Sequence, residues 1–239
     1  MKRSLTLTLL LIAGLMLFSI ASCGGSNERQ FAGSGQEDLD QYAQADYSYD
    51  YEEDVYDAYV EKKEIVSNFK TFPIYTDGRS PDNHYIASGY MGDYSDISID
   101  TASFEDPHSG TTCIKIIYSN ASTQGARWAG VYWQNPANNW GDRQGGFDLT
   151  GATRLTFWLR GEDGGERIEE FKIGGITGLY PDSDIAGIGP VLLSDEWTQY
   201  EIDLRGKDMS YISGGFAWST NLDVNLEGAT FYLDDIRYE

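Results

Sequence analysis

Apolar and polar side chains alternate in short runs through the last 173 residues of the chain. In residues 112–118, for example, Ile114 and Ile116 fall on one side of the alternation and Lys115 on the other. The same period recurs at residues 97–99, 129–134, 154–160, 171–173, 191–193, 200–204, 212–218 and 231–234. Successive side chains of a β-strand point to opposite faces, so a period of two predicts strands. We expect about nine or ten short strands and no helix in this part of the chain.

Glycine-rich turn signals separate these runs, at Ser109-Gly110, Gly145-Gly146, Asp163-Gly164-Gly165 and Arg205-Gly206. Short strands joined by such turns are typical of an all-β sandwich or barrel. A single open sheet of that length would leave long unprotected edges. Residues 67–239 are therefore predicted to form a two-sheet antiparallel β-sandwich of the jelly-roll form, large enough to bury a core of its own.

The first residues have the pattern of an export signal. Lys2 and Arg3 precede an apolar stretch over residues 5–20, which is shorter than the roughly 20 residues of a membrane span. The run Ile20-Ala21-Ser22-Cys23 resembles a bacterial lipobox, in which the chain is cut before the cysteine and the cysteine is acylated. We therefore expect a signal peptide over residues 1–22 and lipidation of Cys23. An ordinary secretory signal and a retained anchor helix are the alternatives.

A lipidated Cys23 places the protein outside the cytoplasm, with the membrane as partner through the N-terminal lipid. Gly24 and Gly25 follow the cysteine, and the lack of an acid there is compatible with the outer membrane or cell surface of a diderm bacterium. Residues 24–66 carry 12 Asp+Glu against 3 Lys+Arg and few aliphatic side chains. Such a segment cannot bury enough apolar surface to fold, so residues 23–66 are predicted to be a disordered acidic tether. A Tyr-modified or adhesive segment, or a short helix over residues 50–66, remains the alternative.

Charge and cysteine content exclude several classes of function. The whole chain has a net charge of −21, and residues 67–239 carry 12 Lys+Arg against 26 Asp+Glu. This argues against a sequence-independent nucleic-acid binder, which needs a cationic surface. Cys113 is the only cysteine of the body, so a disulfide scaffold and a zinc finger are excluded, and its place in a strand predicts a buried or half-buried side chain. No G-x-S-x-G elbow is present, and no pair of acids stands out, so we expect no enzymatic activity.

An aromatic and polar cluster at residues 127–143 indicates a binding site. Sugars have an apolar ring face and a rim of hydroxyls, which aromatic rings and planar polar side chains bind well. On a strand, Trp128 and Tyr132 share one face and Trp133 the other, so one set can fill the core while the other faces outward. The alternative is that all the rings are core. The predicted ligand-binding residues are Trp128, Tyr132, Trp133, Trp140, Arg127, Gln134, Asn139, Tyr90 and Asp93.

Acidic residues near two strand ends suggest a hard cation. Asp100, Glu105 and Asp106 precede the strand at 112–118, and Asp234 lies within the last strand. Calcium takes six to eight oxygen ligands, mostly carboxylates and carbonyls, so these four residues are candidate ligands of a structural Ca²⁺. The alternative is a set of edge-strand charges that face water.

The ending 229–236, Ala-Thr-Phe-Tyr-Leu-Asp-Asp-Ile, resembles the last strand of jelly-roll carbohydrate-binding modules of the galactose-binding-like superfamily. Segments 107–110, 148–158 and 196–204 resemble the same modules, in the same order along the chain. The resemblance implies a calcium-stabilised sandwich that binds glycans on a concave face or at loop tips without catalysis. It also implies that Asp234 ligates the calcium with Asp106 or Glu105. Residues 67–94 form an aromatic, glycine-rich addition that does not fit the generic module.

Three hypotheses follow. The first is a non-catalytic glycan-binding lipoprotein of the bacterial cell envelope, whose partner is a polysaccharide or oligosaccharide. The second is a glycoside hydrolase or polysaccharide lyase on a jelly-roll scaffold, which requires paired acids, or a Tyr or His base with Arg, in one cleft. The third is a structural or adhesion protein of the envelope that does not bind sugar, which an extensive exposed apolar patch would favour.

Overall fold

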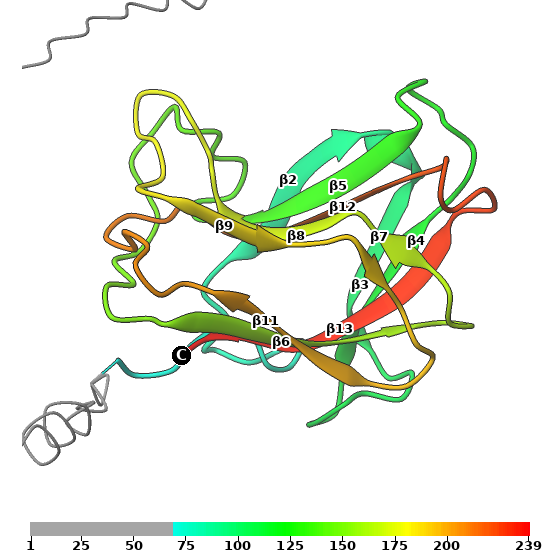
Figure 1. Cartoon of the computed structure of the whole chain (residues 1–239), viewed down its shortest axis with the longest axis horizontal. Coiled ribbons are helices and arrows are strands. Elements are labelled where there is room, and N and C mark those ends of the chain that lie inside the picture. Colours follow the sequence, from blue (N-terminus) through cyan, green and yellow to red (C-terminus); the bar gives the residue numbers. More distant parts are fainter. Residues whose placement is uncertain (1–68) are drawn as a thin grey trace, which may run out of the picture. The chain divides into compact units, whose positions relative to one another are not determined.

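The computed structural model describes residues 69–239, which form two antiparallel β-sheets packed face to face (Figure 1). The strands are β1 (Phe72–Tyr75), β2 (Ile86–Gly92), β3 (Ile97–Ser103), β4 (Cys113–Tyr118), β5 (Trp128–Gln134), β6 (Arg154–Gly161), β7 (Arg167–Ile168), β8 (Glu170–Gly174), β9 (Ile185–Ile188), β10 (Val191–Leu192), β11 (Thr198–Asp203), β12 (Gly214–Asn221) and β13 (Ala229–Tyr238). One turn of 3-10 helix, η1 (Tyr94–Asp96), joins β2 to β3. The predicted all-β sandwich is confirmed.

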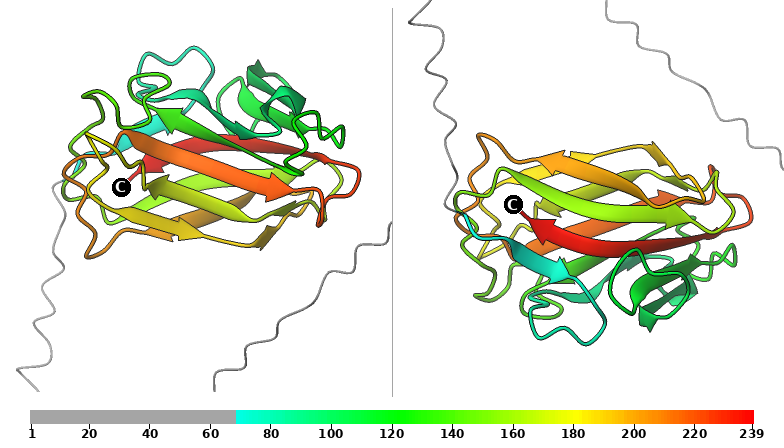
Figure 2. Two further views of the ribbon diagram at one scale, coloured as in Figure 1. Left: turned by 90° about the horizontal axis from the view of Figure 1, so that it is seen from above. Right: turned by 90° about the horizontal axis from the view of Figure 1, so that it is seen from below.

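The first sheet has six strands, in the order β11-β6-β13-β4-β3, with β1 also paired to β13. The long strand β13 has β6 along one edge, while β4 pairs with its first half and β1 with its second half along the other. Figure 2 shows β1 beside β13 in its right-hand view. The change of partner coincides with an irregularity between Asp234 and Arg237, where Asp235 has a φ of 47°. A bulge of this kind re-aims the strand, so one strand serves two partners in succession.

The second sheet has five strands in the order β2-β5-β12-β8-β9 and faces the viewer in the left-hand view of Figure 2. Strands β7 and β10 pair with each other as a small separate ladder. Buried side chains of the two sheets meet in one core, in which Trp133, Phe157, Phe171 and Phe216 pack ring against ring. Their alternation along the strands follows the period of two that predicted the strands.

The aromatic addition at 67–94 is part of the sandwich itself. It contains β1, which completes the first sheet, and β2, which forms an edge of the second. Tyr85, between them, is buried, and its hydroxyl donates a hydrogen bond to the backbone oxygen of Ile212 at 2.8 Å. Cys113 is fully buried in β4, as predicted, and burial raises the pKa of its thiol to about 11.

The signal peptide over 1–22, the lipidation of Cys23, the tether over 23–66 and the short helix at 50–66 lie outside the described residues. These predictions, and the domain boundary before residue 67, stay predictions. Within residues 69–239, no helix has the length and apolar character needed to cross a bilayer.

Candidate functional site

The five predicted aromatic residues divide between core and surface. Trp133 is only 2% exposed and packs edge-on against a core phenylalanine, so its position gives no support to a role in stacking on a ligand. Trp128 and Trp140 are 41% and 44% exposed. Tyr132 is nearly buried but lies on the same side of β5 as Trp128, because the two are four residues apart on one strand. Tyr90 is 40% exposed, but it pairs with core-facing Val131 and so lies on the opposite side of the sheet.

The predicted polar ligands Gln134 and Asn139 are completely buried. Gln134 donates from Nε2 to the backbone oxygen of Asn139 at 2.9 Å, and Ser88 donates to its Oε1 at 3.0 Å. Asn139 donates from Nδ2 to the backbone oxygen of Arg143 at 3.0 Å. These amides are the internal hydrogen-bond partners of the loop after β5, and they face protein groups rather than solvent.

Asp93 and Arg127 also have protein partners. Asp93 is fully buried, and its carboxylate accepts hydrogen bonds from the backbone N–H groups of Ala126 at 2.8 Å and Arg127 at 2.7 Å, and from the Ser122 hydroxyl at 3.1 Å. The Arg127 guanidinium pairs with Asp223 at 2.7 Å and is half-exposed. Asp93 therefore orders the loop that leads into β5, while Arg127 lies near the Trp128 end of the strand.

The outer face of the five-stranded sheet has a floor of small side chains. Gly130 of β5 pairs with Ser219 of β12, and Tyr132 pairs with Ala217. A Cβ atom on Gly130 would lie 2.6 Å from the backbone oxygen of Trp218, so this position tolerates glycine alone. Because residues directly opposite on neighbouring strands share a face, these small side chains lie together on the outer face. The Met91 side chain of β2 packs over Gly130 and against buried Ala217.

Tyr132 and Trp140 form one end of this floor, together with Lys172 of β8. The ring of Trp140 meets that of Tyr132 edge-on, with centroids 5.9 Å apart and an interplanar angle of 84°. The Lys172 ammonium lies 5.4 Å from the centre of the Tyr132 ring and pairs with Glu170 at 3.1 Å. Burial raises the pKa of Tyr132, so the phenol stays protonated and donates to the backbone oxygen of Gly174 at 3.1 Å. We refer to Trp128, Tyr132, Trp140, Lys172 and Glu170 with this floor as the aromatic face.

Backbone contacts between two loops hold Trp140 in position. The loop at 135–147 and the loop at 175–184 project together at one end of the upper sheet in Figure 1. Tyr180 donates its backbone N–H to the backbone oxygen of Gly141 at 2.9 Å. A Cβ on Gly141, whose φ is 85°, would lie 2.0 Å from the Thr177 backbone oxygen, so the close approach requires glycine. The ring is therefore presented on a braced loop, which lowers the entropy cost of binding.

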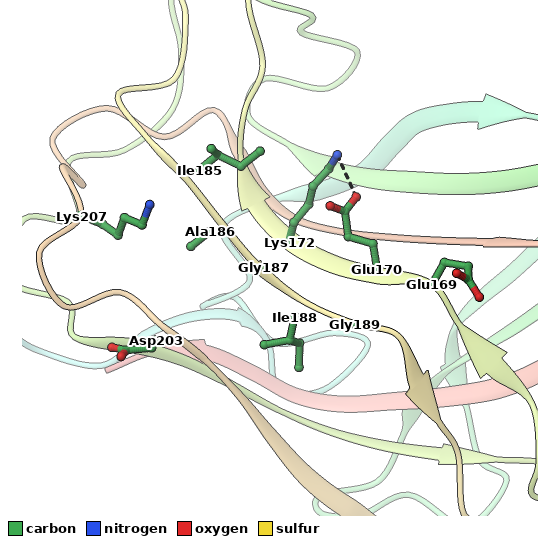
Figure 3. Close-up of a pocket in the computed structure, with 10 residues that line it drawn as sticks. All are labelled: Glu169, Glu170, Lys172, Ile185, Ala186, Gly187, Ile188, Gly189, Asp203 and Lys207. Atoms are coloured by element: carbon green, nitrogen blue, oxygen red, sulfur yellow. Dashed lines mark ion pairs between the residues drawn. The ribbon is translucent and has the colours of Figure 1, made fainter. Parts of the chain in front are cut away.

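A hollow of about 640 Å³ lies beside the aromatic face, along the edge strand β9 (Figure 3). Glu170 and Lys172 of β8 line it, together with Asp203 of β11 and Lys207 of the turn that follows β11. Its floor is apolar and flat, formed by Ile185, Ala186, Gly187, Ile188 and Gly189. Its volume is within the range of small-ligand sites, roughly 300–1,000 Å³. Lys172 joins the hollow to the rings, so the two form one continuous surface.

The four predicted calcium ligands do not gather. Glu105 accepts from the Lys115 ammonium at 2.6 Å, Asp100 caps the backbone N–H of Ala102 at 2.9 Å, and Asp106 is exposed at 3.9 Å from the Arg160 guanidinium. Among residues 69–239, no three or more His, Cys, Asp or Glu side chains are placed to hold a metal ion.

Among the four predicted ligands, only Asp234 is a buried carboxylate. It is fully buried, it accepts the backbone N–H of Ser109 at 3.2 Å, and burial raises its pKa to about 6. The backbone oxygens of Glu105 and Asp106, two of the other predicted ligands, accept protein donors, from Arg160 at 3.2 Å and from Trp197 at 2.9 Å. Residues 69–239 thus give no support to a site with the six to eight oxygen ligands of calcium, and the calcium site stays a prediction.

One pair of acids does converge, on the outer face of the six-stranded sheet. The Tyr232 hydroxyl contacts the carboxylates of Glu105, at 2.8 Å, and Glu162. Burial raises the pKa of Tyr232 to about 12, so it is not a base near neutral pH, and Glu105 is held by Lys115. Neither acid lines the hollow of Figure 3. The sequence contained no signal for this contact, because its residues come from three distant segments.

Two comparisons with known proteins returned no match, neither a protein-family model nor a curated protein. Among solved structures, a family 30 carbohydrate-binding module is similar at 16% identity, with a TM-score of 0.47, over 72% of this chain and 88% of that one. The family 30 module of a cellulosomal cellulase of Clostridium thermocellum is 15% identical, with a TM-score of 0.46, over 71% and 97%.

A family 29 module complexed with mannohexaose is 12% identical, with a TM-score of 0.40, over 71% and 90%. All three structural neighbours are carbohydrate-binding modules, non-catalytic proteins of β-sandwich fold. At these identities and TM-scores the likeness assigns neither a ligand nor a site residue to this chain.

Proposed function

We propose that this protein is a non-catalytic glycan-binding lipoprotein of the bacterial cell envelope, and that it binds a polysaccharide along the aromatic face. The observation that carries this proposal is the exposure of Trp128 and Trp140, 41% and 44%. Tyr132 links them, since it lies on the same side of β5 as Trp128 and meets Trp140 edge-on. Trp128 and Tyr132 are about 14 Å apart along the strand, four residues at about 3.4 Å each. Trp140 contacts Tyr132, so the two indoles can bind separate sugar rings of one extended chain.

The chemistry of the face matches that of a neutral glycan. Indole rings provide flat apolar surfaces for sugar rings, and the Met91 side chain over Gly130 adds apolar surface. Lys172 and Glu170 provide a donor and acceptors beside the rings, and their opposite charges neutralise each other. The adjoining hollow at β9 extends the surface available to the chain.

Affinity electrophoresis of the full-length protein in gels that contain different soluble polysaccharides tests the binding role. At least one polysaccharide should retard the wild type. Trp128→Ala and Trp140→Ala should each weaken binding about tenfold, since removing a stacked ring forfeits about 1–1.5 kcal/mol. Trp197→Ala is the control, because Trp197 is a partly buried indole near the six-stranded sheet and away from the aromatic face. Retention of full binding by the double variant W128A/W140A, or the absence of binding to every polysaccharide, would overturn the proposal.

The lipid anchor has a separate test. Mass spectrometry of the mature N-terminus should show cleavage before Cys23 and an acylated cysteine, because Ile20-Ala21-Ser22-Cys23 matches the lipobox pattern. A Cys23→Ser chain should leave the membrane fraction. An unmodified Cys23 in the mature protein, or cleavage elsewhere, contradicts this part of the proposal without affecting the glycan site.

A further inference from the structure

A second candidate binding surface lies at the turn between β1 and β2. This turn is well separated in sequence from the residues of the aromatic face. Gly78 of this turn packs directly on β3, where an added Cβ would lie 2.6 Å from the backbone oxygen of Thr101 and 2.8 Å from the Ala102 Cβ. The backbone N–H of Gly78 donates to the Thr112 hydroxyl at 2.8 Å. These contacts hold the turn against the end of β3.

Within this turn, the carboxylate of Asp77 is fully engaged by hydroxyl and N–H donors. It accepts from the backbone N–H of Thr111 at 3.1 Å, from the Thr111 hydroxyl at 2.9 Å and from the Thr112 hydroxyl. The Thr112 and Thr111 hydrogen bonds hold the pKa of Asp77 below its ordinary value. Arg79, two residues later, is exposed and forms no ion pair within residues 69–239.

A hollow of about 490 Å³ lies between the turn and the end of β3. The Arg79 guanidinium and the Phe104 ring both line it, together with Ser80, Ala102, Thr111, Thr112 and the Asp77 carboxylate, which Thr111 and Thr112 hold by hydrogen bonds. The Phe104 side chain is 79% exposed, the highest exposure among the large apolar side chains of residues 69–239. A phenylalanine ring left in water beside an unpaired guanidinium is a combination that burial does not explain.

We propose that this hollow binds a uronic acid residue of an acidic glycan. The open ring of Phe104 stacks on the apolar face of the sugar, and the Arg79 guanidinium forms paired hydrogen bonds with the sugar carboxylate. The hydroxyl of Ser80 is available to the sugar hydroxyls. The exposed ring and the free cation line the same hollow, so one sugar residue bound there can reach both. This site does not depend on the aromatic face and extends the range of ligands beyond the neutral glycan proposed above.

Isothermal titration of the full-length protein with trigalacturonate and with its fully methyl-esterified form tests this proposal. The ester keeps the sugar rings and removes the charge, so we expect binding of trigalacturonate to be at least tenfold tighter. Arg79→Ala and Phe104→Ala should each weaken trigalacturonate binding about tenfold. Arg79→Lys should recover part of the loss, because it retains a charge without the planar fork. Both side chains are exposed, so the variants should keep the wild-type melting temperature.

Two control variants separate this site from the aromatic face. Arg143→Ala removes an exposed arginine elsewhere and should leave trigalacturonate binding unchanged. Trp140→Ala should also leave it unchanged, while Phe104→Ala should not alter binding of a neutral polysaccharide. The proposal is overturned if wild type does not bind trigalacturonate, if the methyl ester binds equally well, or if R79A and F104A both bind as the wild type does.

Discussion

The two outer faces of the sandwich have opposite characters. The face of the five-stranded sheet has small side chains at its centre, with Gly130, Ala217 and Ser219 between exposed rings. The face of the six-stranded sheet has long side chains, with Arg160 lying 3.8 Å from the centre of the Tyr232 ring. Both faces are aromatic, so aromatic content alone does not identify a binding surface.

What separates them is the loop between β3 and β4, which folds over the six-stranded sheet. His108 of this loop stacks on Trp158, with ring centroids 3.7 Å apart, and its Nδ1 lies 3.0 Å from the Asp235 carboxylate. The Trp197 indole donates to the backbone oxygen of Asp106 at 2.9 Å. The indoles on this side contact the protein's own loop, while those of the aromatic face remain open. The comparison indicates that one face stabilises the fold and the other is available for a ligand.

The largest expected effect concerns stability. Arg160→Ala should lower the free energy of unfolding by about 2–3 kcal/mol, because Arg160 is nearly buried, donates to Glu105 and lies over the Tyr232 ring. Urea unfolding monitored by tryptophan fluorescence gives the value. Arg143→Ala, at an exposed site, should change it by less than about 0.5 kcal/mol. If the two variants were equally stable, Arg160 would not hold the loop in place.

A substitution that fills the floor should affect binding without affecting stability. Ser219→Trp places a large ring on the outer face of β12, where Ser219 is only half-buried, and should reduce polysaccharide binding more than tenfold. Gln199→Trp is the matched change on exposed β11 of the other sheet and should leave binding intact. Affinity electrophoresis compares the two. Equal retardation of both variants would show that the floor is not the binding surface.

The loop that leads into β5 should be sensitive to acid. Burial opposes the charged form of Asp93, but the N–H groups of Ala126 and Arg127 and the Ser122 hydroxyl outweigh it and hold its pKa below the ordinary value. A lowered pKa stabilises the fold above the unfolded-state pKa, about 3.9, and this contribution disappears as the pH falls through the folded-state value.

Wild type should therefore melt at a higher temperature than Asp93→Asn at pH 7, and the gap should narrow as the pH falls below about 4. Thermal unfolding at a series of pH values measures the gap. A gap that stays constant from pH 7 to pH 3 would mean that the Asp93 charge contributes nothing.

The smallest expected effect is that of metal removal. Glu105, Asp100 and Asp106 are engaged by protein groups or exposed to water, so a chelator should leave the melting temperature unchanged. A clear fall in the melting temperature on adding the chelator, reversed by calcium, would instead support the predicted calcium site and identify Asp234 as its centre.

Strand β5 shows what the alternation of side chains could predict and what it could not. The alternation in 129–134 predicted that Trp128 and Tyr132 share a face opposite Trp133, and the structure confirms that division. The alternation did not indicate which face of β5 other parts of the protein would cover. Gln134 lies on the same face as Trp128, yet it is buried, because the loop after β5 folds back and Asn139 accepts its hydrogen bond.

The strands that prediction missed lack a clean period of two. β9, Ile185–Ile188, has its two isoleucines three residues apart, and β7, Arg167–Ile168, has only two residues. β10, Val191–Leu192, lies within the strand predicted at 191–193. β2 has an irregular register between Ala87 and Gly89, which shifts the alternation along the strand. Pairing with neighbouring strands, a non-local effect, stabilises these segments where their own side chains give little preference.

The sequence by itself determined the all-β architecture, the side of each strand on which a residue lies, and the burial of Cys113, because these depend on local periodicity. Only the tertiary structure decided that Trp128 and Trp140 remain open while Trp158 lies under His108. It also brought Arg79 and Phe104 to one hollow. The physical reason is that the exposure of a side chain, and its distance from other side chains, depend on which loops cover which sheet. Those loop contacts join residues that are distant along the chain.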